Sequence, residues 1–193
     1  NRKNINMGYE DILALSCDLM QRAKDDASAE QRPNIIIILA DDLGWADVGY
    51  HGSDIETPHI DRLAKEGVKL NRFYATPFCS PTRAALMTGR DPLKLGVAYS
   101  VLMPWENGGV SLDEHFMPQS FQEAGYNTAM VGKWHLGFAR RAYLPTSRGF
   151  DSFFGYALGA QDYYTHDTDE MLVGQRPVTR FAGKFEDSGA SPW

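Results

Sequence analysis

Cysteine is scarce in this chain, because Cys17 and Cys79 are the only two among its 193 residues. At most one disulfide can form from them, so a fold stapled by several disulfides is excluded. The sequence also contains no Asn-x-Ser/Thr triplet and no apolar run long enough to span a bilayer. No transmembrane segment is therefore expected. With 43% hydrophobic and 23% charged residues, the composition is that of an ordinary globular domain.

Basic residues are in the minority, since 19 Lys and Arg stand against 25 Asp and Glu and the net charge is -6. Non-specific nucleic-acid binding needs a basic face, so we expect no nucleic-acid partner. An anionic substrate remains possible, because a site can be locally positive inside an acidic protein. Residues 12–17 are apolar, but Glu10 and Asp11 precede them, so they fit a secretory signal poorly.

Hydrophobic patterning divides the chain into three predicted regions. Residues 1–31 are expected to form a helical extension, with an amphipathic helix at 5–24 and a linker. Residues 32–167 alternate strand-like and helix-like patterns, which predicts an α/β domain with a largely parallel central sheet flanked by helices. Residues 168–193 are polar and irregular, and we predict no structure for them.

Within the α/β region the sequence predicts three strands and three helices. The strands are expected at 33–40, 68–75 and 126–131, and the helices at 58–67, 81–89 and 111–125. The first strand has five consecutive aliphatic residues, which indicates burial on both faces. Thr57 is the predicted N-cap before Pro58, and Ser111 opens a capping box. From Arg140 onward we expect loops.

Asp41 and Asp42 directly follow the first predicted strand. In open α/β sheets, ligands bind at the carboxyl ends of the strands. Two adjacent carboxylates repel each other there unless a cation or hydrogen-bond donors lie between them, and Ca²⁺ prefers carboxylate oxygens. A strand-to-helix turn capped by Asp would explain the same residues. Both interpretations stay open.

Cys79 lies just before the helix that Ser80 and Pro81 are predicted to open. The free N–H groups of a helix N-terminus favour an anion. Arg83, one turn further on, could donate a forked pair of hydrogen bonds to an oxyanion. The alternatives are a buried, inert thiol and a thiolate nucleophile favoured by the same helix end.

Lys133 and His135 follow the third predicted strand. Residues two apart on an extended segment point to the same face. A cation beside an imidazole suits binding an anion and transferring a proton. For the pair taken alone, a solvated Lys and a hydrogen-bonded structural His are the favoured interpretation.

Together these residues resemble the type I sulfatase family, whose members depend on formylglycine. The resemblance is carried by Cys79-Ser80-Pro81-Thr82-Arg83 with Leu86-Met87-Thr88-Gly89, by Gly132-Lys133-Trp134-His135-Leu136-Gly137, by Asp41-Asp42-Leu43-Gly44 and by Thr57-Pro58-His59-Ile60-Asp61-Arg62-Leu63-Ala64. It covers residues 32–167 and is strongest to sulfatases of the arylsulfatase B type. The resemblance implies an alkaline phosphatase-like fold, of which this chain would hold the N-terminal part.

The resemblance also implies a mechanism and its residues. A separate maturation enzyme would oxidise Cys79 to formylglycine, whose hydrate attacks sulfur and later helps to expel sulfate. Asp41, Asp42 and the modified Cys79 would bind Ca²⁺, which acts as a Lewis acid. Arg83 would steady the hydrate, and Lys133 would contact both the hydrate and the sulfate. His135 would accept a proton during sulfate release.

Sulfatases are longer than this chain, so the resemblance places further calcium ligands, another His and a second Lys beyond Trp193. The segment alone is expected to be inactive. Residues 1–31 match nothing in the family. Tyr163 and His166 are candidate substrate-binding residues, because aromatic faces stack on sugar or aryl rings. Core packing is the favoured interpretation for any single one of them. The same two interpretations apply to Tyr156, Tyr164, Trp45, Trp105 and Trp134.

The resemblance predicts a sulfuric ester hydrolase that acts on sulfate monoesters of small molecules or saccharides. Two alternatives remain, since a fold does not fix a function. One is a phosphomonoester or phosphonate hydrolase of the same superfold, for which a Ser or Thr would be expected at position 79. The other is a non-catalytic fragment that binds anionic glycans. By resemblance the protein is expected to be exported to the periplasm, the extracellular space or the lysosome.

Overall fold

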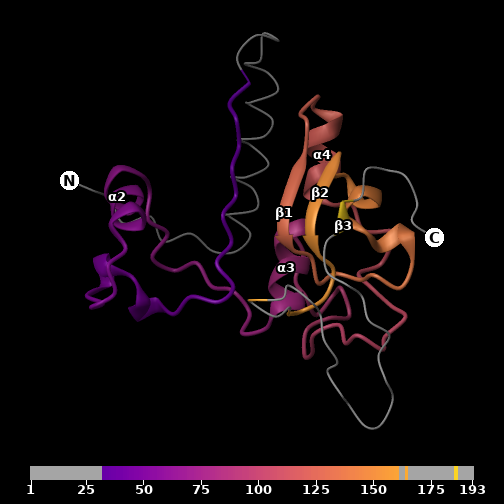
Figure 1. Ribbon diagram of the computed structural model, residues 1–193, viewed down its shortest axis with the longest axis horizontal. Helices are drawn as coiled ribbons and strands as arrows, with labels where there is room; N and C mark the ends of the chain where they lie inside the picture. Colours follow the sequence, from indigo (N-terminus) through magenta and orange to yellow (C-terminus); the bar gives the residue numbers. More distant parts are fainter. Residues whose placement is uncertain (1–31, 161–163, 165–184, 187–193) are drawn as a thin grey trace. The chain divides into compact units, whose positions relative to one another are not determined.

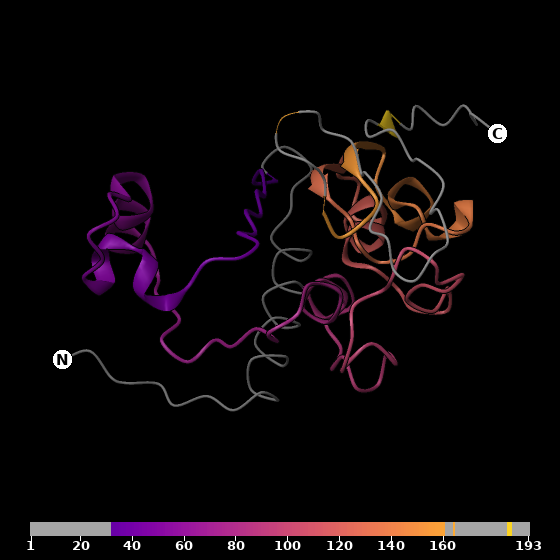
Figure 2. The same cartoon turned by 60° about the horizontal axis from the view of Figure 1, so that its bottom comes forward.

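The computed structural model describes residues 32–160, 164 and 185–186, so the helix predicted at 5–24 lies outside the described residues. Two compact units are present, one within Gln31–Ala75 and one from Thr76 onward (Figures 1 and 2). The predicted region boundaries after residues 31 and 167 border or fall in stretches outside the description, so they stay predictions. Among the described residues, no helix has the length and apolar character needed to cross a membrane.

The unit within Gln31–Ala75 contains three short helices. They are the 3₁₀ helices η1 (Trp45–Asp47) and η2 (Gly49–His51) and the α-helix α2 (Pro58–Glu66). As predicted, Thr57 is the N-cap of α2 and Pro58 lies in its first turn. The Thr57 hydroxyl accepts a hydrogen bond from the Gly49 amide at 2.8 Å and donates one to Asp61 at 2.9 Å. Asp61 also accepts the Tyr50 amide at 3.0 Å, so polar contacts tie η2 to α2.

The strands predicted at 33–40 and 68–75 are absent from the described structure, and both predictions are wrong there. Ile36 and Ile38 are 82% and 84% exposed, and Val68 is 89% exposed. A strand needs a neighbour to pair its N–H and C=O groups. Among the described residues, no backbone hydrogen bond pairs residues 35–39 with another strand. An apolar run supplies the side chains of a buried strand but not its partner.

The unit from Thr76 onward contains a small sheet with helices. Its elements are α3 (Cys79–Thr88), α4 (Met117–Glu123), β1 (Ala129–Lys133), the 3₁₀ helices η3 (Arg141–Tyr143) and η4 (Pro145–Arg148), β2 (Ser152–Tyr156) and β3 (Phe185–Glu186). The strand order is β1-β2-β3. β1 and β2 are parallel, with Ala129 opposite Ser152, whereas β2 and β3 are antiparallel. Parallel strands with flanking helices confirm the predicted α/β class.

Several element boundaries in this unit differ from the prediction. α4 begins at Met117 rather than near Ser111, because Pro118 is tolerated only in the first turn of a helix. The third strand is shifted toward its C-terminus and includes Lys133. β2 was not predicted, although Phe153 and Phe154 have the high strand propensity of aromatic residues.

Two glycines lie opposite each other in the pairing of β1 with β2. Gly132 lies opposite Gly155 in the register, and Gly132 has a φ of 109°. A Cβ at Gly155 would overlap the carbonyl oxygen of Gly132. The neighbouring strand backbone therefore requires glycine at position 155.

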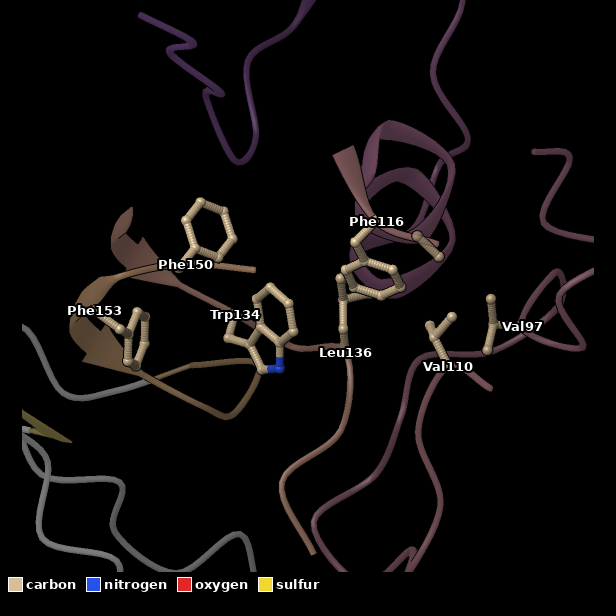
Figure 3. Close-up of a cluster of buried hydrophobic side chains, with 8 residues drawn as sticks. Val97, Val110, Phe116, Trp134, Leu136, Phe150 and Phe153 are labelled. Atoms are coloured by element: carbon tan, nitrogen blue, oxygen red, sulfur yellow. The ribbon is translucent and has the colours of Figure 1, made fainter. Parts of the chain in front are cut away.

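The core of this unit is built around Trp134, which is 1% exposed. Its ring packs at 5.9 Å from Phe116 and 6.3 Å from Phe150, measured between ring centroids. Figure 3 shows Trp134 between Phe150 and Phe116, with Leu136 alongside. The indole Nε1 donates to the carbonyl oxygens of Gly137 at 3.0 Å and Tyr143 at 2.9 Å, so its polar atom is satisfied inside the core.

Arg148 is a second buried anchor, at 4% exposure. Its Nη2 donates to the carbonyl oxygens of Ser111 and Glu114, each at 3.0 Å. The guanidinium carbon lies 3.9 Å from the centroid of the Phe116 ring, a cation–π geometry. Burial lowers the pKa of Arg148 below its usual value, while the negative charge of Glu114 opposes that shift. Arg148 thus fixes the irregular stretch that precedes α4.

Asp151 links the starts of β1 and β2 from an exposed position. Its carboxylate accepts hydrogen bonds from the Thr128 amide and from Gln122 Nε2, both at 2.7 Å. Donation by the Thr128 amide, and then by Gln122, lowers the pKa of Asp151 below its usual 3.8. The charged carboxylate is therefore the form that the folded chain prefers.

Candidate functional site

The first turn of α3 carries the residue predicted to be the nucleophile. Phe78 is the N-cap and Cys79 the first helical residue, so the helix starts earlier than the predicted Ser80-Pro81 opening. Cys79 is a half-buried free thiol. At the N-terminus of a ten-residue helix, its side chain lies where free backbone N–H groups favour an anion.

Two hydrogen bonds connect α3 to the end of β1. The Ser80 hydroxyl, which is fully buried, donates to the carbonyl oxygen of His135 at 2.9 Å. Arg83, at 8% exposure, donates through Nη1 to the carbonyl oxygen of Lys133. Both bonds are long-range in sequence, joining residues 55 and 50 positions apart. The structure therefore brings together the two segments that hold Cys79, Arg83, Lys133 and His135 (Figure 1).

His135 adopts a conformation that its sequence position does not predict. Its φ is 58°, in the left-handed region that few residues other than glycine adopt. Lys133 and His135 were expected to share a face of an extended segment, but the backbone at His135 is not extended. Its amide donates to the Ala157 carbonyl at 3.1 Å, next to the bond from the Trp134 amide to Tyr156.

The imidazole of His135 is buried, at 5% exposure, and its Nε2 lies 2.9 Å from the carbonyl oxygen of Leu102. Leu102 in turn donates its amide to the Ser80 hydroxyl at 3.1 Å. Leu102 was not predicted as a site residue, because a contribution made by the backbone of an irregular segment leaves no side-chain signature in the sequence. The sequence shows that Ser80 follows Cys79, but it does not predict which groups the Ser80 hydroxyl bonds to.

Asp41 and Asp42 lie in the other unit, within Gln31–Ala75, and both are exposed. They follow the irregular stretch that was predicted to be a strand. Their carboxylates are the donors that Ca²⁺ prefers, and the ion takes six to eight oxygens. Among the described residues, no group of three His, Cys, Asp or Glu side chains could hold a metal ion. The pair fits part of a calcium site by its chemistry.

The aromatic candidates separate into different environments. Trp134 belongs to the core, whereas Trp45 is 68% and Trp105 48% exposed. Tyr156 ends β2 and is half-buried, and Tyr164 is 93% exposed. The two predicted substrate-binding residues, Tyr163 and His166, lie outside the described residues.

Comparison with known proteins identifies the family that this chain resembles. A family model described as Sulfatase matches residues 33–188. Arylsulfatase J of Mus musculus is 47% identical over 153 residues, which cover 79% of this chain and 26% of that protein. N-acetylgalactosamine-6-sulfatase of Rattus norvegicus is 46% identical over 138 residues, covering 67% of this chain and 26% of that protein. The chain thus spans about a quarter of the length of these curated relatives.

Among solved structures, the crystal structure of Ps i-CgsB has a TM-score of 0.66 at 46% identity, covering 70% of this chain and 30% of that chain. A second crystal structure of Ps i-CgsB, in complex with k-i-k-neocarrahexaose, has the same TM-score and coverage at 45% identity. These similarities confirm the predicted fold. Because the family model matches well over half of its residues, the chain belongs to the sulfatase family.

Proposed function

We propose that this chain carries part of the active site of an enzyme that hydrolyses sulfate monoesters. The observation that supports it most is the pair of hydrogen bonds from Ser80 and Arg83 to the end of β1. They hold the segment with Cys79 against the segment with Lys133 and His135. A nucleophile, two cations and an imidazole are the groups that sulfuryl transfer requires.

Cys79 is the proposed nucleophile position. Oxidised to formylglycine, it would supply an aldehyde hydrate, in which one hydroxyl attacks and the other assists release of the product. The α3 N-terminus favours the negative charge that develops there, because its first N–H groups have no partner within the helix. A Ser or an unmodified Cys would lack the second hydroxyl and would have no easy route to release sulfate.

Arg83 and Lys133 are proposed to stabilise the charge on the sulfuryl oxygens. The bond from Arg83 Nη1 to the Lys133 carbonyl fixes the guanidinium beside the end of β1. A charge held in place before the reaction costs no reorganisation during it, which makes such stabilisation a large catalytic contribution. His135 is proposed to accept a proton as sulfate leaves.

Asp41 and Asp42, together with the modified Cys79, are proposed to bind Ca²⁺. The ion would supply a Lewis acid for a sulfate oxygen. The role of the two Asp residues here is to hold a hard cation with their carboxylates. Removal of the metal with a chelator, followed by addition of Ca²⁺ or Mg²⁺, tests this part of the proposal, with activity expected to return with Ca²⁺ and not with Mg²⁺.

The proposed substrate is a sulfate ester of a saccharide or another small molecule. The names of two similar proteins support this substrate class. One is an N-acetylgalactosamine-6-sulfatase, and the other was solved in complex with a neocarrahexaose. Tyr163 and His166 remain the proposed substrate-binding residues. We further propose a formylglycine-generating or equivalent maturation enzyme as a partner, and export from the cytosol, as the sulfatase resemblance implies.

Mass spectrometry of the Cys79 peptide from the native host is the direct test of the nucleophile. Conversion to formylglycine removes sulfur and two hydrogens and adds one oxygen, which is distinct from the ordinary oxidation ladder of a thiol. An unmodified thiol in active protein would contradict the proposed nucleophile. An unmodified thiol in inactive protein would favour a non-catalytic sulfatase-like fragment.

Kinetics of the complete native protein complete the test. Cys79→Ala is expected to reduce hydrolysis of an aryl sulfate to background while the fold survives, because the thiol is half-buried and small. Cys79→Ser is expected to release one aryl product per enzyme and then stop. Parallel assay of an aryl phosphate separates the phosphatase alternative, which predicts the higher kcat/KM for the phosphate.

A further inference from the structure

The Ser80 hydroxyl joins two segments that are far apart in the sequence. It accepts a hydrogen bond from the Leu102 amide at 3.1 Å and donates one to the His135 carbonyl at 2.9 Å. Ser80 is fully buried, so water does not compete for either bond. One hydroxyl therefore fixes the Leu102 segment relative to the backbone of His135.

The backbone of Leu102 also contacts the His135 ring. Its carbonyl oxygen lies 2.9 Å from Nε2. A carbonyl can only accept, so Nε2 must carry a hydrogen for this bond to form. In a neutral imidazole only one nitrogen is protonated, and Nδ1 is then the basic nitrogen.

Gly159 lies against the His135 ring and leaves space for it. A Cβ at this position would lie 2.6 Å from Cε1 and 3.0 Å from Nε2 of His135. No real Cβ approaches so closely, so the absence of a side chain at Gly159 gives the imidazole its room. Gly159 and Leu102 together restrict where the ring can lie, and the left-handed φ of 58° at His135 sets the direction in which it leaves the backbone.

We propose that Ser80 is a positioning residue that fixes the Nε2–H tautomer of His135 by holding the Leu102 carbonyl against the ring, so that Nδ1 is the atom that takes up the proton. The reaction in question is the one proposed above, and this inference rests on it. When Nδ1 becomes protonated, the ring acquires a positive charge and the bond from Nε2 to Leu102 becomes charge-assisted. The Leu102 carbonyl thus stabilises the protonated ring, and Ser80 acts on the chemistry without touching the substrate.

The tautomer can be measured in the wild-type protein. The complete native protein is labelled with ¹⁵N-histidine, and long-range ¹H–¹⁵N correlations are recorded at a pH where His135 is neutral. A His135→Gln spectrum assigns its signals. We expect a protonated Nε2 and an unprotonated Nδ1. A protonated Nδ1 in the wild type would overturn the proposal, whatever the variants do.

Substitution of Ser80 tests the positioning. Ser80→Ala removes both bonds and is expected to mix the two tautomers and to lower kcat about tenfold, equivalent to a loss of roughly 1.4 kcal/mol, with KM nearly unchanged. Ser80→Thr keeps the hydroxyl and is expected to retain the wild-type tautomer. Ser120→Ala is the matched control, because its hydroxyl contacts a different imidazole, His115, at 3.0 Å. Wild-type kcat and tautomer in Ser80→Ala would contradict the proposal.

Gly159→Ala provides an independent variant if Ser80→Ala does not fold. The added Cβ must displace the imidazole, so the Nε2–H signal is expected to move and kcat to fall at least as far as in Ser80→Ala. Gly108→Ala is the control, since a Cβ there meets nothing within 4 Å. An unchanged His135 spectrum in Gly159→Ala would count against the proposed packing.

The two proposals can fail separately. A wild type without sulfatase activity, in which Ser80→Ala still mixes the tautomers, would support the positioning and overturn the proposed function. An active wild type in which Ser80→Ala changes neither kcat nor the tautomer would leave the function standing and overturn the positioning.

Discussion

The two compact units use apolar residues in different ways. In the unit from Thr76 onward, Trp134, Phe116 and Leu136 are each 1% exposed. Among the described residues within Gln31–Ala75, Val48 is the one buried hydrophobic side chain, and Ile36 and Ile38 are left more than 80% exposed.

The difference lies in backbone pairing and not in hydrophobicity. Trp134 continues from β1, whose ladder with β2 extends through the Trp134 and His135 amides. Residues 35–39 are at least as apolar, yet no described strand pairs with them. Apolar residues form a core where hydrogen-bonded elements present them to one another. In the smaller unit, polar contacts around Asp61 provide the organisation instead.

Hydrogen exchange should show the largest contrast between the units. In the 193-residue chain, we expect the Trp134 and His135 amides to exchange at least about a thousandfold more slowly than those of Ile36 and Ile38, because only local opening limits the latter. The measurement is native-state exchange read by NMR or mass spectrometry. Equal protection in both segments would show that residues 35–39 find a partner strand. The same comparison in the complete protein would reveal whether further chain supplies one.

Truncating a tryptophan in each unit should give the next largest contrast. Trp134→Ala removes a buried ring and two hydrogen bonds, and we expect it to lower the free energy of unfolding by about 3–5 kcal/mol. Trp45→Ala removes a ring that is 68% exposed and stacks on His51 at 3.5 Å. Its expected cost is about 1 kcal/mol or less. Denaturant unfolding monitored by circular dichroism measures both, and similar losses would erase the distinction between the units.

Each unit also contains a cation over an aromatic ring. Arg148 lies buried over Phe116 and bonds two carbonyls, whereas Lys69 is exposed, 5.6 Å from the centroid of Tyr50. We expect Arg148→Ala to cost about 2–3 kcal/mol, because it removes a buried side chain together with the donor of two part-buried hydrogen bonds and the cation over Phe116. Lys69→Ala should cost no more than about 0.5–1 kcal/mol. Arg148→Lys, which retains the charge but not the fork of donors, should lie between them.

The smallest expected contrast is in how stability changes with pH. The folded chain holds the pKa of Asp151 below its usual 3.8, so this carboxylate contributes stability above that pH. The contribution is lost as the pH falls through the lowered pKa, because the protonated carboxyl no longer accepts the same bonds. We expect Asp151→Asn to be less stable than the wild type at neutral pH, with the gap closing in acid. Thermal unfolding at each pH measures the gap, with Asp54→Asn as an exposed control variant in the other unit.

Local signals in the sequence predicted local structure well. Thr57 and Pro58 fixed the start of α2, and Gly89 ends α3 with a φ of 66°. The helix predicted from Ser111 failed because the pattern placed Pro118 in its interior. β2 was missed because five residues give too short a pattern to read as a strand.

The sequence predicted which residues belong to the candidate site but not how they are arranged. The motifs around Cys79 and Lys133 identified the segments that the structure joins. The left-handed backbone at His135 and the carbonyl of Leu102 could not be predicted, because both depend on contacts between residues distant in sequence. The strand predicted before Asp41 shows the converse case, in which a strong local pattern lacks the partner that it needs.

The meeting of Gly132 and Gly155 constrains how this protein can evolve. A side chain at position 155 would collide with the main chain of Gly132, and only a shift of the strand backbone could relieve that collision. Ordinary compensating mutations are thus closed to this position, and a deep mutational scan should find it intolerant of all nineteen alternatives. Only a change in strand register or an insertion could release it, so descendants of this sequence that vary at position 155 should also differ in how the two strands align.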